Sequence, residues 1–497
     1  MVNLGASILY HARRTPQRLA IVYDDQRIDY ADLADRIRAM AGFLRQRGVG
    51  TDQVVAVLMK NSAAFLEIAC AVSHLGAVFL PINFRLAADE VEYILGNAGA
   101  VLLFVDEELE ATAANVASRI VVGRAAQRDT RALSGDAPRI DPVVRAPGDL
   151  FRLMYTSGTT DRPKGVVHVY ENFHWKCWDQ IADLGLSAQD RLLVVGPLYH
   201  VGAFDLPGMA VLEVGGSLVV QRDFEPEDAL AAIERERVTC AWFAPVMAGR
   251  LLAHEGRERF DLSSFRWCIG GGERTPEARI RGFTDLFRNA RYIDGYGLTE
   301  TCGGDTLMEA GREIEKIGST GRALAHVELS IRDGEGTVLP PRAEGEICLR
   351  GPKVMRGYWK DPAKTAASFF GDWFRTGDVG YVDEEGFLYL TDRKKDMIIS
   401  GGENIASSEV ERVLYQLPQV AECAVVGLPD ERWGERPVAV VVLRPGASLD
   451  QADLERHCRA HLAAFKVPRQ LVLRDALPRN PSGKVLKRVL REELASG

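Results

Sequence analysis

The sequence predicts an α/β protein with a large N-terminal domain of layered sheets, a β-rich subdomain within it, and a small α+β domain at the C-terminal end. Through the first two-thirds of the chain, short apolar runs alternate with helical patterns, which is typical of largely parallel sheets covered by helices. Beyond residue 317 the runs become strand-like and are separated by turn signals. The length of 497 residues allows roughly two or three domains.

The N-terminal region contains the clearest secondary-structure signals. Short runs of branched apolar residues predict strands, and an apolar stretch with helical spacing predicts a helix between them. We expect strands over residues 53–59, 78–82, 191–195, 217–221 and 238–244, and a helix over residues 63–75.

The β-rich subdomain is predicted over about residues 317–392. Its strand-like runs are separated by Asp333-Gly334, Glu344-Gly345 and Glu385-Gly386, which are dipeptides that favour turns. A charged tract over residues 392–396 ends this region. We therefore place the large domain at residues 1–392.

The remaining residues, 393–497, are predicted to form the small domain. Ser408 and Glu411 have the spacing of a capping box, which predicts the start of a helix. Strands are expected near residues 423–426 and 438–443, and a helix near residues 452–462. This pattern indicates a small α+β unit joined to the large domain by a polar segment.

The composition excludes several classes of function. With 69 acidic and 61 basic side chains and a net charge of -8, the chain lacks the broad positive field that a nucleic-acid partner requires. It has no signal-peptide pattern and no run of about eighteen apolar residues, so we expect a cytoplasmic protein without stable membrane insertion. The eight cysteines are scattered, which favours buried free thiols. The oligomeric state stays open, a homodimer included.

A polar, glycine-containing loop follows an apolar strand-like run. Residues 155–165 read YTSGTTDRPKG. Hydroxyl groups and backbone amides suit phosphate oxygens, glycine permits close approach, and lysine adds positive charge. The order of glycine and lysine does not fit the Walker A pattern, so the common NTPase loop is excluded. The candidate phosphate-binding residues are Thr156, Ser157, Gly158, Thr159, Thr160 and Lys164.

At this loop the sequence strongly resembles the adenylate-forming superfamily, which contains acyl-CoA synthetases, peptide-synthetase adenylation domains and beetle luciferases. Further motifs follow in the order of that superfamily: DGYGLTE at 294–300, FRTGD at 374–378, SGGEN at 400–404 and PRNPSGK at 478–484. One departure is Asp161, where the superfamily usually has glycine. Aspartate tolerates left-handed backbone angles, but its charge beside phosphates is unfavourable unless Arg162 or Lys164 compensates.

The resemblance implies an AMP-forming acyl-CoA synthetase that uses ATP, Mg²⁺ and coenzyme A. Transfer of AMP to a carboxylate makes a mixed anhydride that a thiol can attack, so cations and hydrogen-bond donors are needed where oxygen charge accumulates. By resemblance, Lys484 bridges the acyl carboxylate and the phosphate, and Glu300 and Thr156 hold Mg²⁺ beside Thr299. Together with His200, the residues Lys484, Thr156 and Glu300 form the candidate catalytic set.

The same resemblance assigns the nucleotide and coenzyme A contacts. Tyr296 is expected to stack on adenine, and Asp378 to accept the ribose hydroxyls with Arg393 on the same side. The small domain is expected to be mobile and to rotate about Lys395 so that a thiol can enter. The other residues expected at the nucleotide or coenzyme A are Gly271, Gly272, Asp294, Gly295, Gly297, Gly401, Gly402 and Glu403.

Residues 197–202, PLYHVG, match the segment whose histidine lines or gates the acyl pocket in many acyl- and aryl-CoA ligases. The other residues expected at this pocket are apolar or small, which favours a hydrophobic acid, either fatty or aromatic. These residues are Trp242, Phe243, Ala244, Cys302, Gly303 and Gly304.

Three alternative functions stay open. Asp205 superficially resembles the aspartate that binds a substrate ammonium group in peptide-synthetase domains, which would indicate amino-acid adenylation. A stand-alone enzyme that loads an acyl or aminoacyl group onto a carrier protein would use the same motifs. A non-catalytic nucleotide-binding homologue is expected to have lost Lys484, Glu300 or the loop hydroxyls, and all of these are present.

Overall fold

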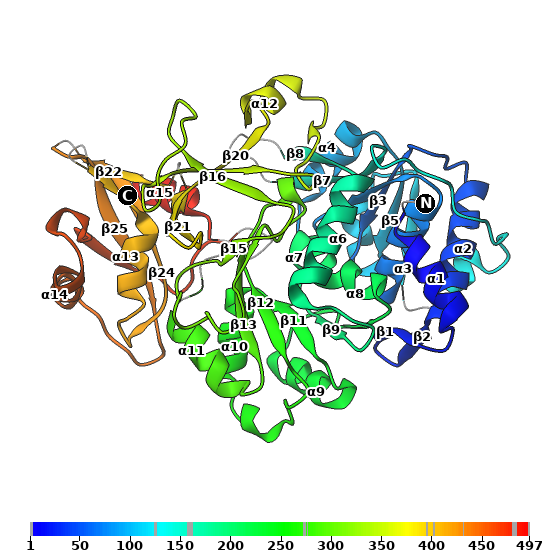
Figure 1. The fold of residues 1–497 in the computed structure, drawn as a ribbon, viewed down its shortest axis with the longest axis horizontal. Coiled ribbons are helices and arrows are strands. Elements are labelled where there is room, and N and C mark those ends of the chain that lie inside the picture. The colour runs from blue at the N-terminus through cyan, green and yellow to red at the C-terminus, as the bar shows by residue number, and fades with distance from the viewer. Residues whose placement is uncertain are drawn as a thin grey trace.

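The computed structural model confirms the predicted α/β class, with a large N-terminal part and a small C-terminal part (Figure 1). The structure describes residues 3–123, 127–156, 163–271, 275, 277–393, 396–400, 403–430, 432–479 and 485–495, with only the backbone described at 392, 393 and 404. The elements predicted in the N-terminal region are present within two residues of their expected ends. The division of domains at residue 392 stays a prediction.

One N-terminal sheet has the strand order β18-β8-β7-β4-β3-β5-β6. The pairs among β3 to β6 and the β4–β7 pair are parallel, whereas β7 and β8 form an antiparallel hairpin. Strand β3 is buried at every residue, as its unbroken apolar run predicts. The bounds are β3 Val54–Leu58, β4 Val78–Pro81, β5 Ala100–Asp106, β6 Arg119–Val122, β7 Leu150–Thr156, β8 Lys164–Val169 and β18 Gly357–Tyr358.

The second N-terminal sheet has the order β15-β14-β13-β12-β11-β9-β10-β1-β2. Its central strands, from β13 to β1, pair in parallel, so their carboxyl ends meet at one edge. The bounds are β1 Leu19–Tyr23, β2 Gln26–Asp29, β9 Arg191–Val194, β10 Ser217–Val220, β11 Cys240–Phe243, β12 Trp267–Gly270, β13 Arg291–Tyr296, β14 Thr306–Leu307 and β15 Arg322–Ala323.

Helices form three layers around these two sheets. Helices α3, α6 and α8 pack in the core between the sheets, α9, α10 and α11 cover the far face of the second sheet, and α4 covers the far face of the first. The bounds are α1 Gly5–Arg14, α2 Tyr30–Gln46, α3 Ala63–His74, α4 Ala88–Ala98, α5 Thr130–Ser134, α6 Tyr170–Leu184, α7 Val201–Ala203, π-helix η2 Phe204–Gly208, α8 Met209–Glu213, α9 Pro226–Glu236, α10 Pro245–Ala253 and α11 Glu277–Leu286. Short 3₁₀ turns are η1 Glu107–Ala113, η3 Arg257–Arg259, η4 Thr299–Thr301 and η5 Ala464–Lys466.

The β-rich subdomain is an antiparallel sheet of order β16-β17-β20-β19, with β21 paired to β20. The predicted turn at Glu344-Gly345 is wrong, because Gly345 starts β17 and pairs with Gly380. A Cβ atom at Gly345 would lie 2.5 Å from the Arg332 carbonyl oxygen, so this glycine serves a close approach within the sheet. The bounds are β16 Glu328–Arg332, β17 Gly345–Arg350, α12 Pro362–Ala367, β19 Phe369–Phe370, β20 Trp373–Val382 and β21 Leu388–Arg393.

The C-terminal part has its own sheet, of order β23-β22-β25-β24 with β26 on β25, and an apolar core on each face. The predicted helix near residue 408 is present, but its predicted capping box is wrong. The helix begins at Ser407, the Ser408 hydroxyl donates to the Thr391 carbonyl, and Glu411 accepts from the Val425 amide. The bounds are β22 Ile398–Ser400, β23 Glu403–Ile405, α13 Ser407–Leu414, β24 Val420–Asp430, β25 Gly434–Leu443, α14 Gln451–His461, β26 Gln470–Leu473 and α15 Lys487–Ala495.

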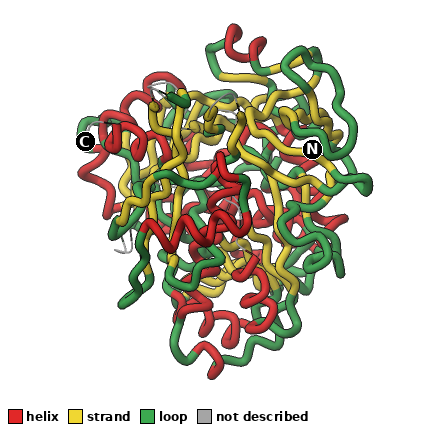
Figure 2. Tube along the Cα trace, turned by 90° about the vertical axis from the view of Figure 1, so that its left-hand side faces the viewer, coloured by secondary structure: helices red, strands yellow, loops and turns green. Residues whose placement is uncertain are grey.

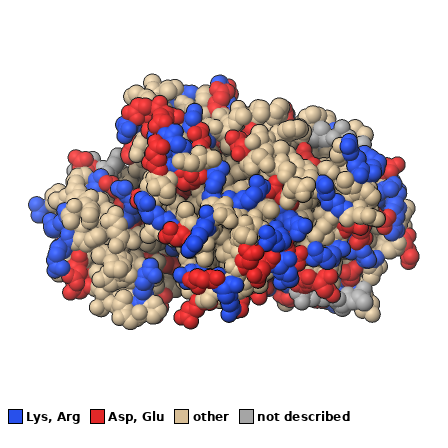
Figure 3. Space-filling view, turned by 60° about the horizontal axis from the view of Figure 1, so that its bottom comes forward, with Lys and Arg blue, Asp and Glu red and all other residues tan. Residues whose placement is uncertain are grey.

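The surface and the cysteines agree with the composition. Figure 2, viewed from the side of the C-terminal part, shows helices and strands interleaved through the molecule, and Figure 3 shows basic and acidic side chains interspersed over one face. All eight cysteines are free and buried. Among the described residues, no helix is both long and apolar enough to cross a membrane.

Candidate active site

A cavity of about 1240 Å³ lies where the carboxyl ends of several strands meet the β-rich subdomain and the C-terminal part. Strands β7, β11, β12 and β13 all end at this cavity, which is the position where open parallel sheets bind ligands. The predicted site residues that line it are Thr156, Lys164, His200, Gly271, Asp294, Gly295, Tyr296, Gly297, Thr299, Glu300 and Asp378.

The remaining predicted residues are not placed at the cavity by the described part of the chain. Glu403, on β23, is exposed and does not line it. Arg393 ends β21, where its backbone pairs with Asp378 of β20. Outside the described residues lie Ser157, Gly158, Thr159, Thr160, Gly272, Lys395, Gly401, Gly402 and Lys484.

One end of the cavity gathers a lysine, a tyrosine and a glutamate. Thr156 and Lys164 face each other across the β7–β8 hairpin. The Lys164 ammonium donates to the Tyr358 hydroxyl at 2.9 Å, and that hydroxyl donates to Glu300 Oε1, also at 2.9 Å. Lys164 Nζ lies 3.8 Å from the same carboxylate oxygen. Burial, followed by the Glu300 charge, raises the pKa of Tyr358, so its hydroxyl remains a donor.

The Thr156 hydroxyl is buried and has no hydrogen-bond partner among the described residues. A buried hydroxyl without a partner is costly unless a ligand supplies one. Glu300 is buried, at 9% exposure, and also lines the cavity. Mg²⁺ in nucleotide sites is commonly held by one or two protein oxygens together with phosphates and water. The residues at this end therefore fit a metal-bound phosphate.

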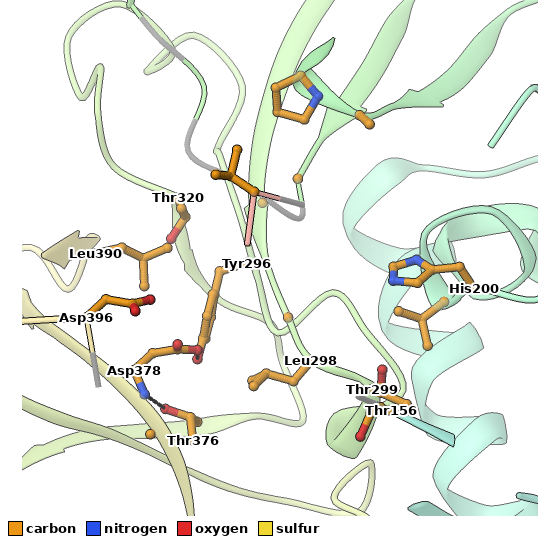
Figure 4. A pocket seen from close by; sticks show the side chains of 18 of the residues that line it. Thr156, His200, Tyr296, Leu298, Thr299, Thr320, Thr376, Asp378, Leu390 and Asp396 are labelled. Carbon is orange, nitrogen blue, oxygen red and sulfur yellow. Dashed lines mark hydrogen bonds between the residues drawn. The ribbon is translucent and has the colours of Figure 1, made fainter. Parts of the chain in front are cut away.

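The opposite wall carries a tyrosine and an aspartate from different sheets. The Tyr296 hydroxyl donates to Asp378 Oδ2 at 2.8 Å, and the Asp378 amide donates to the Thr376 hydroxyl at 3.1 Å (Figure 4). Burial raises the pKa of Tyr296 well above its ordinary value, with the Asp378 charge adding to it. The two residues thus present a flat ring and a carboxylate side by side, a pair that suits a nucleoside.

Glycine at 297 allows two backbone segments of this wall to meet. A Cβ atom there would lie 2.3 Å from the Gly304 amide nitrogen, which is far closer than a carbon atom can approach. At Gly271 a Cβ atom would lie 3.0 Å from the Gly295 carbonyl oxygen. The cavity wall between the two strand ends is therefore made of backbone.

The third part of the cavity is lined by His200 and Trp242, away from Tyr296 and Asp378 (Figure 4 shows His200). His200 Nδ1 accepts from the Gly202 amide at 3.0 Å, so a neutral ring carries its proton on Nε2. The Trp242 indole packs on two glycines: a Cβ atom at Gly196 or Gly202 would lie 2.6 or 2.5 Å from the ring. This part of the cavity suits an apolar group.

Some residues expected at the acyl pocket do not line it. Trp242 and Ala244 do, but Phe243 faces the core on the other side of the sheet, because side chains alternate along β11. Cys302 is fully buried, and neither it nor Gly303 or Gly304 lines the cavity. The pocket at this end is therefore formed by fewer of these residues than the sequence predicts.

Asp205 lies outside the cavity and already has partners. It is fully buried, its Oδ2 lies 2.9 Å from Arg152 Nη2, and its Oδ1 lies 3.8 Å from Lys176 Nζ. Two buried cations therefore neutralise this carboxylate from within the protein. Asp205 is not placed to bind a substrate ammonium group, as an amino-acid adenylation enzyme would require.

Sequence reasoning missed the side chains that hold the site together. Tyr358 joins Lys164 to Glu300, but it belongs to β18, which reaches the site only by pairing with β8. Thr376 lies inside the FRTGD segment, and its hydroxyl donates to the Ile347 carbonyl at 2.7 Å. No local sequence pattern predicts the contacts of Tyr358 or of Thr376, because their partners are distant in the chain.

Comparison with known proteins agrees with this geometry. The model of the AMP-binding enzyme family matches residues 9–359, and that of the AMP-binding enzyme C-terminal domain matches residues 409–484. A feruloyl-CoA synthase of Amycolatopsis is 38% identical over 98% of both chains. A long-chain-fatty-acid–CoA ligase of Mycobacterium tuberculosis is 36% identical over 100% of this chain and 99% of its own.

Among solved structures, the o-succinylbenzoate CoA synthetase of Bacillus subtilis is similar over the whole chain. Its complex with the acyl-adenylate intermediate has a TM-score of 0.88 and 32% identity, covering 99% of this chain and 98% of its own. Its complex with ATP and magnesium has a TM-score of 0.87 and 32% identity, covering 98% and 99%. The chain therefore belongs to the AMP-binding enzyme family, in the acyl-CoA synthetase branch of the adenylate-forming superfamily.

Proposed function

We propose that the protein is an AMP-forming acyl-CoA synthetase that activates a hydrophobic carboxylic acid with ATP and transfers the acyl group to coenzyme A. The observation that carries this proposal is one cavity with three chemically distinct parts. Thr156, Lys164 and Glu300 form a phosphate end, Tyr296 and Asp378 form a nucleoside wall, and an apolar pocket lies around Trp242. An acid and ATP bound there would meet at the middle of the cavity.

In the first half-reaction the acid's carboxylate attacks the α-phosphorus of ATP and pyrophosphate leaves. Negative charge accumulates on the phosphate oxygens, so fixed cations and donors lower the barrier. Lys164 faces the phosphate end, and Lys484 is assigned to the reacting carboxylate and phosphate. Mg²⁺, when bound, neutralises phosphate charge, and Thr156 and Glu300 are the residues that would hold it. Ser157, Gly158, Thr159 and Thr160 would complete the phosphate loop.

The nucleoside wall orients ATP for this attack. The Tyr296 ring would stack on adenine, and Asp378 would accept the ribose hydroxyls, with Arg393 on the same side. The Asp378 carboxylate has two acceptor oxygens, so it can accept from the ribose hydroxyls while it still accepts from the Tyr296 hydroxyl. The strand-end backbone at Gly271, Gly272, Asp294, Gly295 and Gly297 would approach the base and the acyl phosphate.

The second half-reaction requires a thiol to reach the acyl carbonyl. We assign this step to a rotation of the C-terminal domain about Lys395, which would bring Gly401, Gly402 and Glu403 to coenzyme A. Two observations support assigning the present arrangement to the first half-reaction. Arg479 and Val485, on either side of Lys484, line the cavity, whereas Glu403 is exposed outside it.

The acid is proposed to be aromatic or fatty, as in the similar ligases, and the reaction to take place in the cytoplasm, where ATP and coenzyme A are available. The test is pyrophosphate and AMP release from ATP with benzoic, cinnamic, indoleacetic and straight-chain acids, each with and without coenzyme A. Acid-dependent pyrophosphate release with coenzyme A-dependent AMP turnover is the expected result. Absence of pyrophosphate release with every acid would refute the proposal.

A carrier-protein loader is the second candidate, because it would need the same adenylation site. The comparison that separates the two uses coenzyme A and an acyl carrier protein as alternative acceptors in the same assay. Faster acyl transfer to the carrier than to coenzyme A would favour the loader. Amino-acid adenylation is disfavoured, because Arg152 and Lys176 already neutralise Asp205.

A further inference from the structure

A buried polar network lies behind the phosphate end of the cavity. Arg152 and His168 are direct cross-strand partners in the β7–β8 hairpin, as are Thr156 and Lys164. Because side chains alternate along a strand, all four project from the same face of the hairpin. Arg152 is 1% exposed and His168 is 0% exposed. The network therefore continues the active-site face of the hairpin into the protein interior.

The hydrogen bonds of His168 determine where its proton lies. Arg152 Nε donates to His168 Nδ1 at 2.8 Å, and a guanidinium nitrogen can only donate. The ring proton is therefore on Nε2, which donates to the Thr299 carbonyl oxygen at 2.7 Å. Burial, reinforced by Arg152, lowers the pKa of His168 well below its ordinary value and keeps the ring neutral.

Arg152 is itself held from the opposite side. Its guanidinium lies 2.9 Å from Asp205 in an ion pair, and three phenyl rings surround its Cζ atom at 5.3 to 6.0 Å from their centroids. Lys176 donates to the Asp205 carbonyl at 2.8 Å and so fixes that residue too. Asp205 belongs to η2, close after His200 in the chain. Buried charges tolerate little displacement when each depends on its partner, so this end of the network is rigid.

The other end of the network is the segment that carries the proposed metal ligand. Thr299 and Glu300 both line the cavity, and Figure 4 shows Thr299 at the same end as Thr156. The Glu300 carbonyl accepts from the Met355 amide at 2.7 Å, and its carboxylate accepts from Tyr358. His168 supplies the bond from behind, through the Thr299 carbonyl. These three contacts hold the two-residue segment from two sides, by His168 of β8 and by residues 355–358, which include β18.

We propose that His168, backed by Arg152, is a positioning residue for adenylation that fixes Thr299 and Glu300 at the distance from Thr156 and Lys164 that MgATP requires. The inference rests on the proposed function, because there this segment is assigned to the metal-bound phosphates. Removing a buried donor leaves the Thr299 carbonyl unpaired, and a small displacement of a catalytic group has a large effect on rate.

The test uses His168→Leu, which keeps a similar size but removes both hydrogen bonds, and His168→Gln, whose amide can accept from Arg152 and donate to Thr299. His74→Leu is the matched control. His74 is also 0% exposed, its Nε2 bonds the Ile140 carbonyl at 3.0 Å, and it does not line the cavity. If His168→Leu does not fold, His168→Asn replaces it, because the shorter amide cannot reach both partners.

The measurements are calorimetric binding of MgATP and of AMP without acid, the kcat and KM for MgATP with an active acid, and thermal melting. We expect His168→Leu to weaken MgATP binding and lower kcat/KM for MgATP by about 10- to 100-fold. AMP binding should stay near wild type, because AMP lacks the β- and γ-phosphates. His168→Gln should recover most of the loss. His74→Leu should lower the melting temperature while leaving the MgATP parameters unchanged.

Two results would overturn the proposal: a destabilised His168→Leu protein that binds MgATP like wild type, or His168→Gln no better than His168→Leu. The proposed function can fail separately. If the wild-type protein binds MgATP but none of the tested acids supports pyrophosphate release, the ligase assignment fails. The binding comparison still tests His168 in that case.

Discussion

Trp242→Ala should convert the protein into a ligase for longer acids. The indole lines the acyl end of the cavity, is 7% exposed and packs on Gly196 and Gly202. Behind it lies a void too small for a water molecule, lined by Ala203 and by residues 192–196. The ring thus closes the cavity toward the core, and its removal joins the two spaces.

The size of the effect follows from the apolar volume that is released. An acid longer by about four methylene groups could bury them in the space of the indole, and each buried methylene is worth about 0.8 kcal/mol. The full gain is about 3 kcal/mol, or about 200-fold in relative kcat/KM, and partial collapse of the site reduces it to about tenfold. The folded protein should lose about 3 kcal/mol of stability or less, because the ring already lines the cavity and its loss opens less new space than a fully enclosed side chain would.

The assay compares kcat/KM, measured by AMP release, for benzoic and cinnamic acids and for straight-chain acids from butanoic to dodecanoic acid. Trp267→Ala is the control, because Trp267 is a 4% exposed tryptophan at the start of β12 that does not line the cavity. It should lose stability without changing the order of preferred acids. A folded Trp242→Ala protein with the wild-type chain-length profile would show that the indole does not limit the acid.

Three further predictions concern single groups. Lys484→Ala should slow adenylation by about two to three orders of magnitude in a pyrophosphate-release assay. It should leave transfer from supplied acyl-adenylate to coenzyme A largely intact, and equal losses in both steps would contradict the assigned role. Thr156→Val should lower kcat/KM for MgATP by about tenfold or more without lowering the melting temperature, because the lost hydroxyl has no described protein partner; a lower melting temperature would argue for a structural hydroxyl. Burial raises the pKa of Glu67 from 4.5 to about 7, so its stabilising contribution is complete below about pH 4.5 and is lost as pH rises through 7. The free energy of unfolding of Glu67→Gln, relative to that of the wild type, should therefore rise by about 2.5 kcal/mol from about pH 5 to about pH 8, as measured by urea unfolding. A difference that does not change with pH would contradict the raised pKa.

The parts of the fold that could be predicted are those specified by neighbouring residues. Helix α3 spans Ala63–His74, one residue shorter than predicted. It could be predicted because its apolar spacing and the Ser62 cap both depend on residues that are close in the chain. Among the strands that end at the cavity, β11 and β12 are unbroken apolar runs and β7 and β13 are mainly apolar runs, and neither pattern needs a distant partner to be recognised. The motif residues lie at the ends of those runs, so the approximate position of the site followed from the same signals.

The capping box at Ser408 and Glu411 failed because distant partners compete for the same groups. The sequence spacing offers Glu411 a backbone amide one turn away. In the fold it accepts from the Val425 amide at 2.8 Å and pairs with Lys487 Nζ at 2.7 Å. A charged partner and a strand amide together stabilise the carboxylate more than a single helix-end amide does. Sequence spacing identifies only partners that are close in the chain, so it cannot predict the contacts of Glu411 with Val425 and Lys487.

The same limit explains why the support of the metal-binding segment could not be predicted. The motif names Thr299 and Glu300, but their position depends on His168 behind them and on Tyr358 beside them. Both contacts depend on β8. This strand carries His168, and it pairs with β7 on one side and with β18, the strand of Tyr358, on the other. Substitutions at positions 152, 168 and 358 should therefore change how the protein handles MgATP while every motif residue stays in place.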